Sequence, residues 1–257
     1  MQPPIPPLLF SALLFVGMLV LLEVGGRLAI RRGIADSEEQ RLGTIEASVF
    51  ALFGLLMAFT FSGAALRFNE KRMLIAEEAN AIGTAYLRLQ LLPLKTQPEL
   101  KDLFRSYVDS RLESYRRLPD VAAAQQEAAK SQKLQDEIWA KSVDATREPG
   151  THLDAGKLLL PALNTMIDIT TTRAMALQVH PPTIIYVLLF GLSLICSFLA
   201  GYRVASGGNR SWLHIVLFAL VTVIVVYVIL DVEYPRAGFF RLDAADQLLV
   251  NLRRNMK

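Results

Sequence analysis

Polar side chains recur at helical spacing in two otherwise apolar parts of the sequence. Asn80, Thr84 and Arg88 stand four residues apart, with Glu78 just before them. Residues at this spacing lie on one face of an α-helix, so they form a polar stripe. A second stripe with the same spacing consists of Asn164, Asp168 and Thr172, with Arg173 next to it. The chemistry available to both stripes is hydrogen bonding and charge pairing.

Two interpretations of these stripes remain open. Two buried stripes that face each other would satisfy one another's hydrogen bonds, which is a structural role. Alternatively, they form a ligand or ion site. Gly83, in the middle of the first stripe, costs about 1 kcal/mol relative to alanine inside a helix. We therefore expect another helix to pack closely there, and residues 158–182 are the candidate partner.

A further set of side chains could line a pathway through a membrane. Glu46 and Thr60 lie roughly on one helical face, with Phe53 between them. A carboxylate at a membrane entrance could tune the passage of ions, although the favourable interaction of a carboxylate with a helix N-terminus is the simpler explanation of Glu46. Phe53 and Phe59 could form an apolar constriction or could simply face lipid or the protein core. Glu46, Phe53 and Thr60 are our candidate pathway residues.

Charged residues also gather at the end of the last apolar stretch. Asp231 and Glu233 are followed by Pro235, which ends a helix, and then by Arg236 and Arg241. We interpret Asp231, Glu233 and Arg236 as a cluster at the membrane exit, in which the arginines pair with the carboxylates.

Nothing in the sequence has the pattern of a catalytic or metal site. The histidines, at positions 152, 180 and 214, are far apart, and the common nucleotide, nucleophile and zinc motifs are absent. Cys196 is the only cysteine, which excludes an intramolecular disulfide. We expect no enzyme activity, no metal and no cofactor.

The composition is that of a membrane protein, because 53% of the residues are hydrophobic and 20% are charged. Four spans are predicted, at residues 7–28, 45–66, 183–202 and 212–230, and each is long enough to cross a bilayer as a helix. The first contains Glu23 and Arg27 and could be read as a secretory signal. It lacks a basic start and a small-residue cleavage site, so we expect an uncleaved helix.

The remaining sequence predicts an all-α protein with a helical soluble domain inserted between spans 2 and 3. The predicted division is residues 1–66 (first span pair), 67–182 (soluble domain), 183–230 (second span pair) and 231–257 (short polar tail). Helices are expected at 97–118, 120–146 and 154–179. One helix should run through residues 44–92 up to Pro93. The Ala- and Gln-rich segment 120–146 is either a solvated helix or a partner-binding one.

Two lines of small residues occur within the spans. Gly54, Ala58 and Ser62 form one line, and the other consists of Ser193, Ser197 and Gly201. Small side chains let helices approach closely, so both lines predict helix packing, within a subunit or between subunits. A pore lined by small and hydroxyl residues would have the same pattern.

Charge provides less information. The net charge is +3, and acidic and basic residues nearly balance in segment 67–182, which argues against nucleic-acid binding. Basic residues near the span ends are divided almost equally between the two sides of the membrane. We favour an orientation with both termini and the middle domain in the cytoplasm.

The order of several blocks resembles the bestrophin-like domain family of bacterial membrane proteins. These blocks are FGLLMAFTFSGAALRF, EEANAIGTAYLRLQLLP, LLPALNTMIDITTTR and VILDVEYPRAG. This family is related to bestrophins, which are pentameric anion channels. The resemblance implies a homo-oligomer, a pentamer by analogy, in a bacterial inner membrane, with span 45–66 nearest the axis and a cytosolic middle domain. It also implies membrane lipid and an inorganic ion as partners. No acidic cluster resembles the bestrophin calcium site.

The sequence therefore supports two functional hypotheses. The first is an oligomeric ion channel whose second span lines the pathway, with anions as the expected ions. The second is a non-conducting membrane scaffold or sensor whose helical domain binds a partner.

Overall fold

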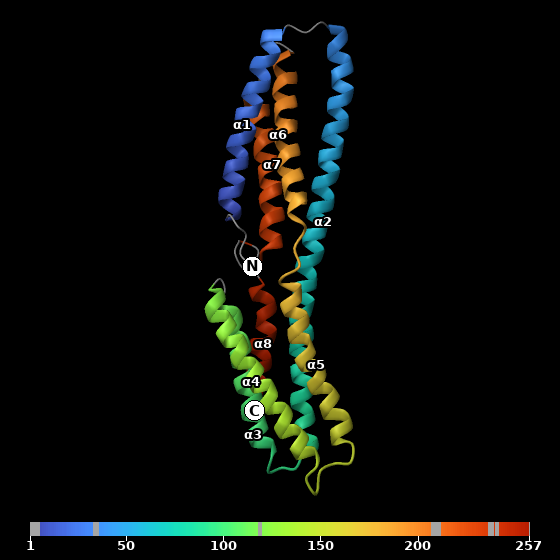
Figure 1. Ribbon diagram of the computed structural model, residues 1–257, viewed down its shortest axis with the longest axis vertical. Coiled ribbons are helices and arrows are strands. Elements are labelled where there is room, and N and C mark those ends of the chain that lie inside the picture. Colours follow the sequence, from blue (N-terminus) through green and yellow to red (C-terminus); the bar gives the residue numbers. More distant parts are fainter. Residues whose placement is uncertain are drawn as a thin grey trace. The chain divides into compact units, whose positions relative to one another are not determined.

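The computed structural model describes residues 6–32, 36–117, 120–206, 212–235, 239 and 242–256; for residues 32, 36–42, 121, 206 and 243 it describes the backbone alone. Every regular element in these ranges is a helix (Figure 1). Contacts divide the chain into two compact units. We call Pro3–Arg67 with His180–Tyr234 the span unit, and Phe68–Val179 with Pro235–Lys257 the polar unit.

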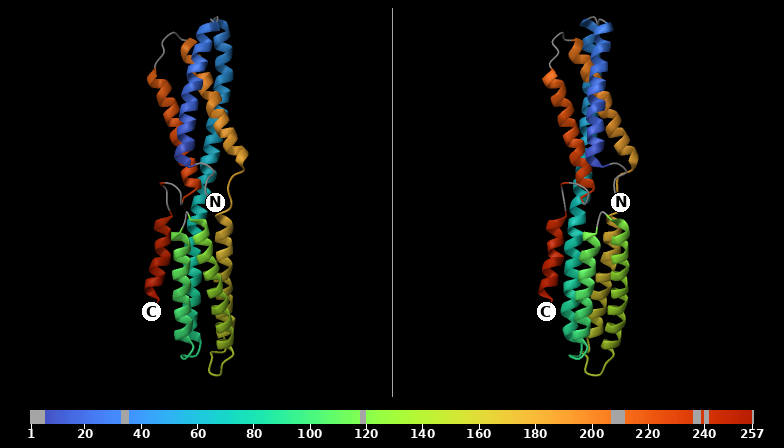
Figure 2. Two further views of the ribbon diagram at one scale, coloured as in Figure 1. Left: turned by 60° about the vertical axis from the view of Figure 1, so that its left-hand side comes forward. Right: turned by 90° about the vertical axis from the view of Figure 1, so that its left-hand side faces the viewer.

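The span unit contains the four helices that are long and apolar enough to cross a membrane. These are α1 (Pro7–Arg32), the first part of α2 (Asp36–Arg88), α6 (Thr183–Ser206) and α7 (Trp212–Glu233). Long apolar runs with few or no charged residues explain them, because a helix rises 1.5 Å per residue and about 20 residues cross the apolar layer. In Figures 1 and 2, α1 runs beside α6 and α7, and it contacts both.

Helices α1 and α6 meet through glycine. A Cβ added at Gly25 would overlap the carbonyl oxygen of Phe198, and one added at Gly201 would overlap the carbonyl group of Leu22. At both positions the neighbour is main chain, which cannot swing aside as a side chain can. The two helices therefore pack backbone to backbone, a geometry that only residues without a Cβ permit.

Helix α2 has 53 residues and no proline, so nothing interrupts its hydrogen-bond ladder. Residues up to Arg67 belong to the span unit, and residues from Phe68 belong to the polar unit. The helix ends at Arg88 and is followed by the short 3-10 helix η1 (Leu89–Leu91), just before Pro93. The predicted helix through residues 44–92 has therefore nearly the expected C-terminal end.

In the polar unit, the last part of α2 packs with α3 (Gln97–Arg116), α4 (Val121–Thr146) and α5 (Ala155–Ala176). The apolar core includes Ile82, Phe104 and Leu163. Asp120 caps α4 by accepting a hydrogen bond from the Ala123 amide at 3.1 Å. Figure 2 shows these helices as a bundle of roughly parallel rods.

The polar unit also includes a helix that the sequence pattern does not predict. Helix α8 (Asp243–Asn255) occupies part of the expected polar tail. Its residues Leu249 and Leu252, together with the flanking Leu242 and Met256, contribute to the core. Arg253 pairs with Asp109 of α3 through two hydrogen bonds of 2.8 and 2.9 Å. The described part of the segment expected to be a short polar tail is therefore packed onto the apolar core of the polar unit.

Candidate functional site

Helix α2 has two distinct faces within the span unit. Phe53 and Thr60 are buried, with 4% and 7% of their surfaces exposed, and Glu46 is also buried. The Thr60 hydroxyl donates to the Leu56 carbonyl at 2.7 Å, and Glu46 lies 3.7 Å from Arg203 of α6. The candidate pathway residues thus share a face, as expected, and this face packs against the other helices of the same chain.

The opposite face of α2 is uncovered. Leu52, Leu55, Phe59 and Leu66 recur at helical spacing, and each is more than half exposed; Phe59 is 68% exposed. We call these four residues the open α2 face. Any pathway that α2 lines together with other copies of the chain must use exposed side chains. The burial of Phe53 and Thr60 therefore argues against contact of these two side chains with such a pathway.

The two lines of small residues also differ in exposure. Ser193, Ser197 and Gly201 of α6 are buried, and both serine hydroxyls donate to carbonyl groups one turn earlier in the helix. Gly54, Ala58 and Ser62 of α2 are exposed, and a Cβ at Gly54 would have no atom within 4 Å. The α6 line is used for packing within the chain, whereas the α2 line is uncovered.

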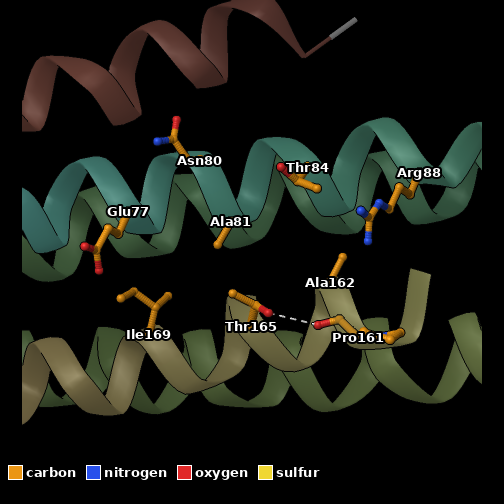
Figure 3. Close-up of a pocket in the computed structure, with 9 residues that line it drawn as sticks. All are labelled: Glu77, Asn80, Ala81, Thr84, Arg88, Pro161, Ala162, Thr165 and Ile169. Atoms are coloured by element: carbon orange, nitrogen blue, oxygen red, sulfur yellow. Dashed lines mark hydrogen bonds between the residues drawn. The ribbon is translucent and has the colours of Figure 1, made fainter. Parts of the chain in front are cut away.

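In the polar unit, the first polar stripe borders a groove between α2 and α5. The groove has a volume of about 510 Å³ and includes Glu77, Asn80, Thr84 and Arg88 from α2. The α5 wall consists of Pro161, Ala162, Thr165 and Ile169. In Figure 3, Glu77 and Arg88 point toward α5, whereas the Asn80 amide points away from it.

The expected pairing of the two stripes is wrong for most of their members. Asn80, Thr84, Asn164 and Asp168 are all exposed in the protomer. No hydrogen bond joins the first two of these described side chains to the last two. Arg88 instead donates to the Leu158 carbonyl of α5. The physical reason is that Pro161 and Thr165 line the α5 side of the groove, whereas Asn164 and Asp168 lie at the surface.

The stripes are joined at one point, by an ion network around Glu78. This carboxylate is fully buried and accepts hydrogen bonds from Arg111 of α3, at 2.6 Å, and from Arg173 of α5. The Tyr115 ring lies beside both guanidinium groups, with its centroid 4.1 Å from Arg173 Cζ and 5.1 Å from Arg111 Cζ. The network ties three helices together at one carboxylate.

The stability of the polar unit should therefore depend strongly on the Glu78 carboxylate. Removing one partner of a buried ion pair typically costs about 3–5 kcal/mol, because the remaining charge is left without compensation. Tyr107 is a buried neighbour of Arg111. Burial raises the pKa of Tyr107, while the charge of Arg111 and the hydrogen bond with Gln135 partly oppose this shift. These contacts support a structural role for Glu78 and Arg173.

The end of α7 forms a second buried polar cluster, which lies entirely in the span unit. Arg67 holds Glu233 through three hydrogen bonds of 2.8 to 3.1 Å, and the Glu233 side chain is fully buried. His180 Nδ1 lies 3.0 Å from Glu233 Oε1. The sequence pattern indicates Glu233 but not these partners, since it pairs the carboxylates with Arg236 and Arg241. Among the residues that it did propose, Asp231 is buried, and Arg236 lies outside the described residues.

Arg67 and His180 were overlooked because sequence spacing gives no indication of contacts so remote along the chain. Arg67 is 166 residues from Glu233. The available signals were indirect: Arg67 directly follows an uncharged span, and His180 stands just before two prolines and the next span. No group of three or more His, Cys, Asp or Glu side chains among the described residues could hold a metal ion.

Comparisons with known proteins relate this architecture to a family. Two crystal structures of a bacterial bestrophin homologue from Klebsiella pneumoniae match with a TM-score of 0.68. One is a single-residue variant, 16% identical, with 94% of this chain and 98% of that chain covered. The other is 15% identical, with 97% of both chains covered. A crystal structure of a membrane protein variant is 17% identical, with a TM-score of 0.65 and 94% and 97% coverage.

At such identities these matches establish the fold alone, and no curated protein sequence matches. The model of the bestrophin-like domain, however, matches residues 8–246, which is most of the chain. This agrees with the resemblance of the sequence blocks and with several apolar helices of membrane-spanning length. The protein is a multi-pass membrane protein, and the chain belongs to the bestrophin-like domain family.

Proposed function

We propose that the protein is an oligomeric ion channel in which the open α2 face lines the pathway. The observation that carries this proposal is the asymmetry of α2. Only 17% of an apolar 18-residue stretch of α2 is buried within the chain, whereas the corresponding share is 28% in α1 and in α6 and 44% in α7. A span that makes so few contacts in its own protomer is well suited to contacts with other copies.

The uncovered line of Gly54, Ala58 and Ser62 supports this assembly. Small residues at this spacing let another helix approach closely, and no atom of the described residues lies within 4 Å of a Cβ placed at Gly54. With neighbouring copies packed on this line, the adjoining open α2 face would surround a shared axis. Leu55 and Phe59 would then form an apolar constriction, the type of barrier that gates by excluding water.

Assembly is tested first, by the mass of the protein in a mild detergent. We expect an oligomer, with five copies by analogy with bestrophins. A monomeric mass in detergents that preserve folding, measured by light scattering or native mass spectrometry, would exclude a pathway along a symmetry axis.

Conduction is tested in planar bilayers with halide and cation gradients. We expect unitary currents, with anions as the permeant ions by analogy. Phe59→Ala should change conductance or selectivity, because it removes a ring from the open α2 face. Phe61→Ala is the matched control, since this exposed phenylalanine lies on another side of the same helix. Absence of unitary currents under every ion gradient would instead support the alternative, a non-conducting scaffold or sensor.

We also propose that the polar unit lies outside the membrane, in the cytoplasm of a bacterial cell, with the spans in the inner membrane. Its charged surface supports a place outside the apolar layer, and the cytoplasmic side is inferred by analogy with bestrophins. A reporter that is active only in the cytoplasm should be active when it is fused near Gln125 and when it is fused at the C-terminus. Periplasmic activity of either fusion would reverse the assignment.

A further inference from the structure

A second groove lies within the span unit, between α2 and α6. Its volume is about 370 Å³, within the range of about 300–1,000 Å³ that ligand sites have. Glu46 and Arg203 supply its charged groups. The rest of its wall consists of Gly43 and four apolar side chains, those of Ala47, Phe50, Ala200 and Val204. Charged groups and an apolar wall thus share one groove.

Both charged residues stand at the boundary of an apolar run. The run of α2 that follows Glu46 contains no charged residue up to Leu66, and the run of α6 that begins at Thr183 contains none before Arg203. Such boundaries lie in the headgroup layer of a bilayer, with the uncharged runs in the hydrocarbon layer. The groove therefore extends from the headgroup layer toward the hydrocarbon layer.

The two charged groups lie side by side at one level. Side chains of a helix lean toward its N-terminus, so the Glu46 carboxylate reaches back toward the level of Gly43. The Arg203 guanidinium lies against Gly43, where a Cβ would overlap it. The nearest atoms of the two charged groups are 3.7 Å apart, and the Arg203 side chain is 46% exposed. The guanidinium is therefore accessible beside a carboxylate.

Each charged group has the capacity to bind a ligand in addition to its partners in the protein. A guanidinium has five N–H donors, and a carboxylate has about four acceptor sites. Arg203 suits a phosphate, which two parallel N–H groups can bind together. Glu46 suits a primary ammonium, which donates hydrogen bonds to a carboxylate.

The charges of the groove also disfavour other headgroups. The charges of Glu46 and Arg203 cancel, so a headgroup with a net negative charge would place that charge beside a carboxylate without compensation. A quaternary ammonium has no N–H group to donate to Glu46. The complementary headgroup carries one phosphate and one primary ammonium, which lie along the membrane surface as the two protein charges do.

We propose that this groove is a binding site for a phospholipid whose headgroup is a phosphate diester with a primary ammonium, as in phosphatidylethanolamine. Arg203 binds the phosphate, Glu46 binds the ammonium, and an acyl chain packs along Phe50 and Val204. The apolar wall distinguishes a lipid from a soluble molecule with the same headgroup, because only the lipid buries apolar surface there. The site does not depend on ion conduction.

The test is native mass spectrometry of the intact protein in a mild detergent, with lipids that share the same acyl chains. We expect saturable binding of phosphatidylethanolamine, about tenfold tighter than that of phosphatidylglycerol or phosphatidylcholine. Soluble glycerophosphoethanolamine should not displace it. Equal binding of the three lipids, tighter binding of the anionic one, or no saturable binding would overturn the proposal, and displacement by the soluble compound would exclude a lipid as the specific occupant.

Substitutions assign the preference to this groove. Glu46→Gln should reduce the binding of phosphatidylethanolamine to the level of phosphatidylcholine, and Arg203→Gln should weaken the binding of all three lipids. Arg27→Gln is the matched control, since this exposed arginine pairs with Glu23 on α1 and is not part of the groove wall. Unchanged preference in Glu46→Gln, or an equal loss in Arg27→Gln, would contradict the site.

A further variant leaves both charges in place. Gly43→Ala adds a Cβ where the guanidinium lies, and this flexible group can move aside without disturbing the main chain. We therefore expect a folded protein that binds all three lipids more weakly than the wild type. If Glu46→Gln does not fold, Gly43→Ala and the lipid series on the wild type decide, and wild-type binding by Gly43→Ala would count against the proposal.

Discussion

The two lines of small residues have the same sequence pattern but different environments. On α6, the line of Ser193, Ser197 and Gly201 is buried, and Gly201 lies against the α1 main chain. On α2, the line of Gly54, Ala58 and Ser62 is exposed in the protomer. The difference shows that such a motif specifies close approach but not the partner, which depends on the surface that faces it.

Helix α1 provides a complementary surface for the α6 line. Gly25 of α1 lies against the main chain of Phe198 in α6, and Gly201 of α6 lies against the main chain of Leu22 in α1. Each helix therefore contributes a residue without a side chain to the contact. Within the described part of the protomer, no atom comes within 4 Å of a Cβ built at Gly54. The following substitutions test whether the α6 line stabilises the protomer and the α2 line stabilises the oligomer.

The largest effect should come from Gly201→Leu. Its side chain would overlap the Leu22 main chain, which cannot yield without separating α1 from α6. We expect no folded protomer, measured as loss of a monodisperse peak in size-exclusion chromatography. Gly191→Leu on the same helix is the matched control, because a Cβ there meets no atom within 4 Å. Equal recovery of both variants would show that the α1–α6 contact is not so close.

The next largest effect should be that of Phe53→Ala, which tests the buried face of α2. Removing a buried phenylalanine leaves a cavity and typically costs about 3–5 kcal/mol. Phe59→Ala on the open α2 face should cost far less, because its ring contacts little in the protomer. Melting of both variants under conditions that keep the protein monomeric measures the difference. A reversed order would mean that the two faces are misassigned.

A smaller effect on the protomer is expected for Gly54→Leu. The new side chain would enter open space, so the protomer should melt near the wild-type temperature. If other copies pack on this line, however, the bulk should separate them and lower the mass in mild detergent. An intact oligomer with unchanged stability would remove the α2 line from the interface.

The smallest effect should come from Gly83→Ala in the polar unit, where the contact is a flexible side chain. A Cβ there would lie 3.3 Å from Leu252 Cδ1, which can shift by a few tenths of an ångström. Alanine also gains about 1 kcal/mol of helix propensity over glycine. We expect a net change below about 1 kcal/mol in unfolding experiments. A large loss would show that α8 is held there as rigidly as α1 is held on α6.

Local features of this fold could be predicted from the sequence. Three of the four spans follow from uncharged length and the first from a long apolar run with two charged residues, and α3 to α5 follow from helical periodicity between prolines. The buried face of α2 could not be predicted, because residues facing lipid are as apolar as those facing the protein interior, so the pattern contains no contrast. Phe53 and Phe59 are chemically identical, and only the three-dimensional packing distinguishes them.

Contacts between residues far apart in the sequence could not be predicted either. Glu78 was selected as part of a stripe, but its partner Arg111 lies on a helix whose residues gave no sign of that ion pair. The close helix contact predicted at Gly83 exists, although it is made by Leu252 of α8 and not by segment 158–182. Helix α8 was missed because it is short and rich in charge, so that its few apolar positions were read as a polar tail.

The position of α8 after α6 and α7 in the chain has a consequence for biosynthesis. Helices α2 to α5 leave the ribosome before α6 and α7, whereas Leu249 and Met256, which complete their core, follow α7. The polar unit must therefore wait, with part of its apolar surface uncovered, until α8 has been made, and it is most exposed to proteases and chaperones during that interval.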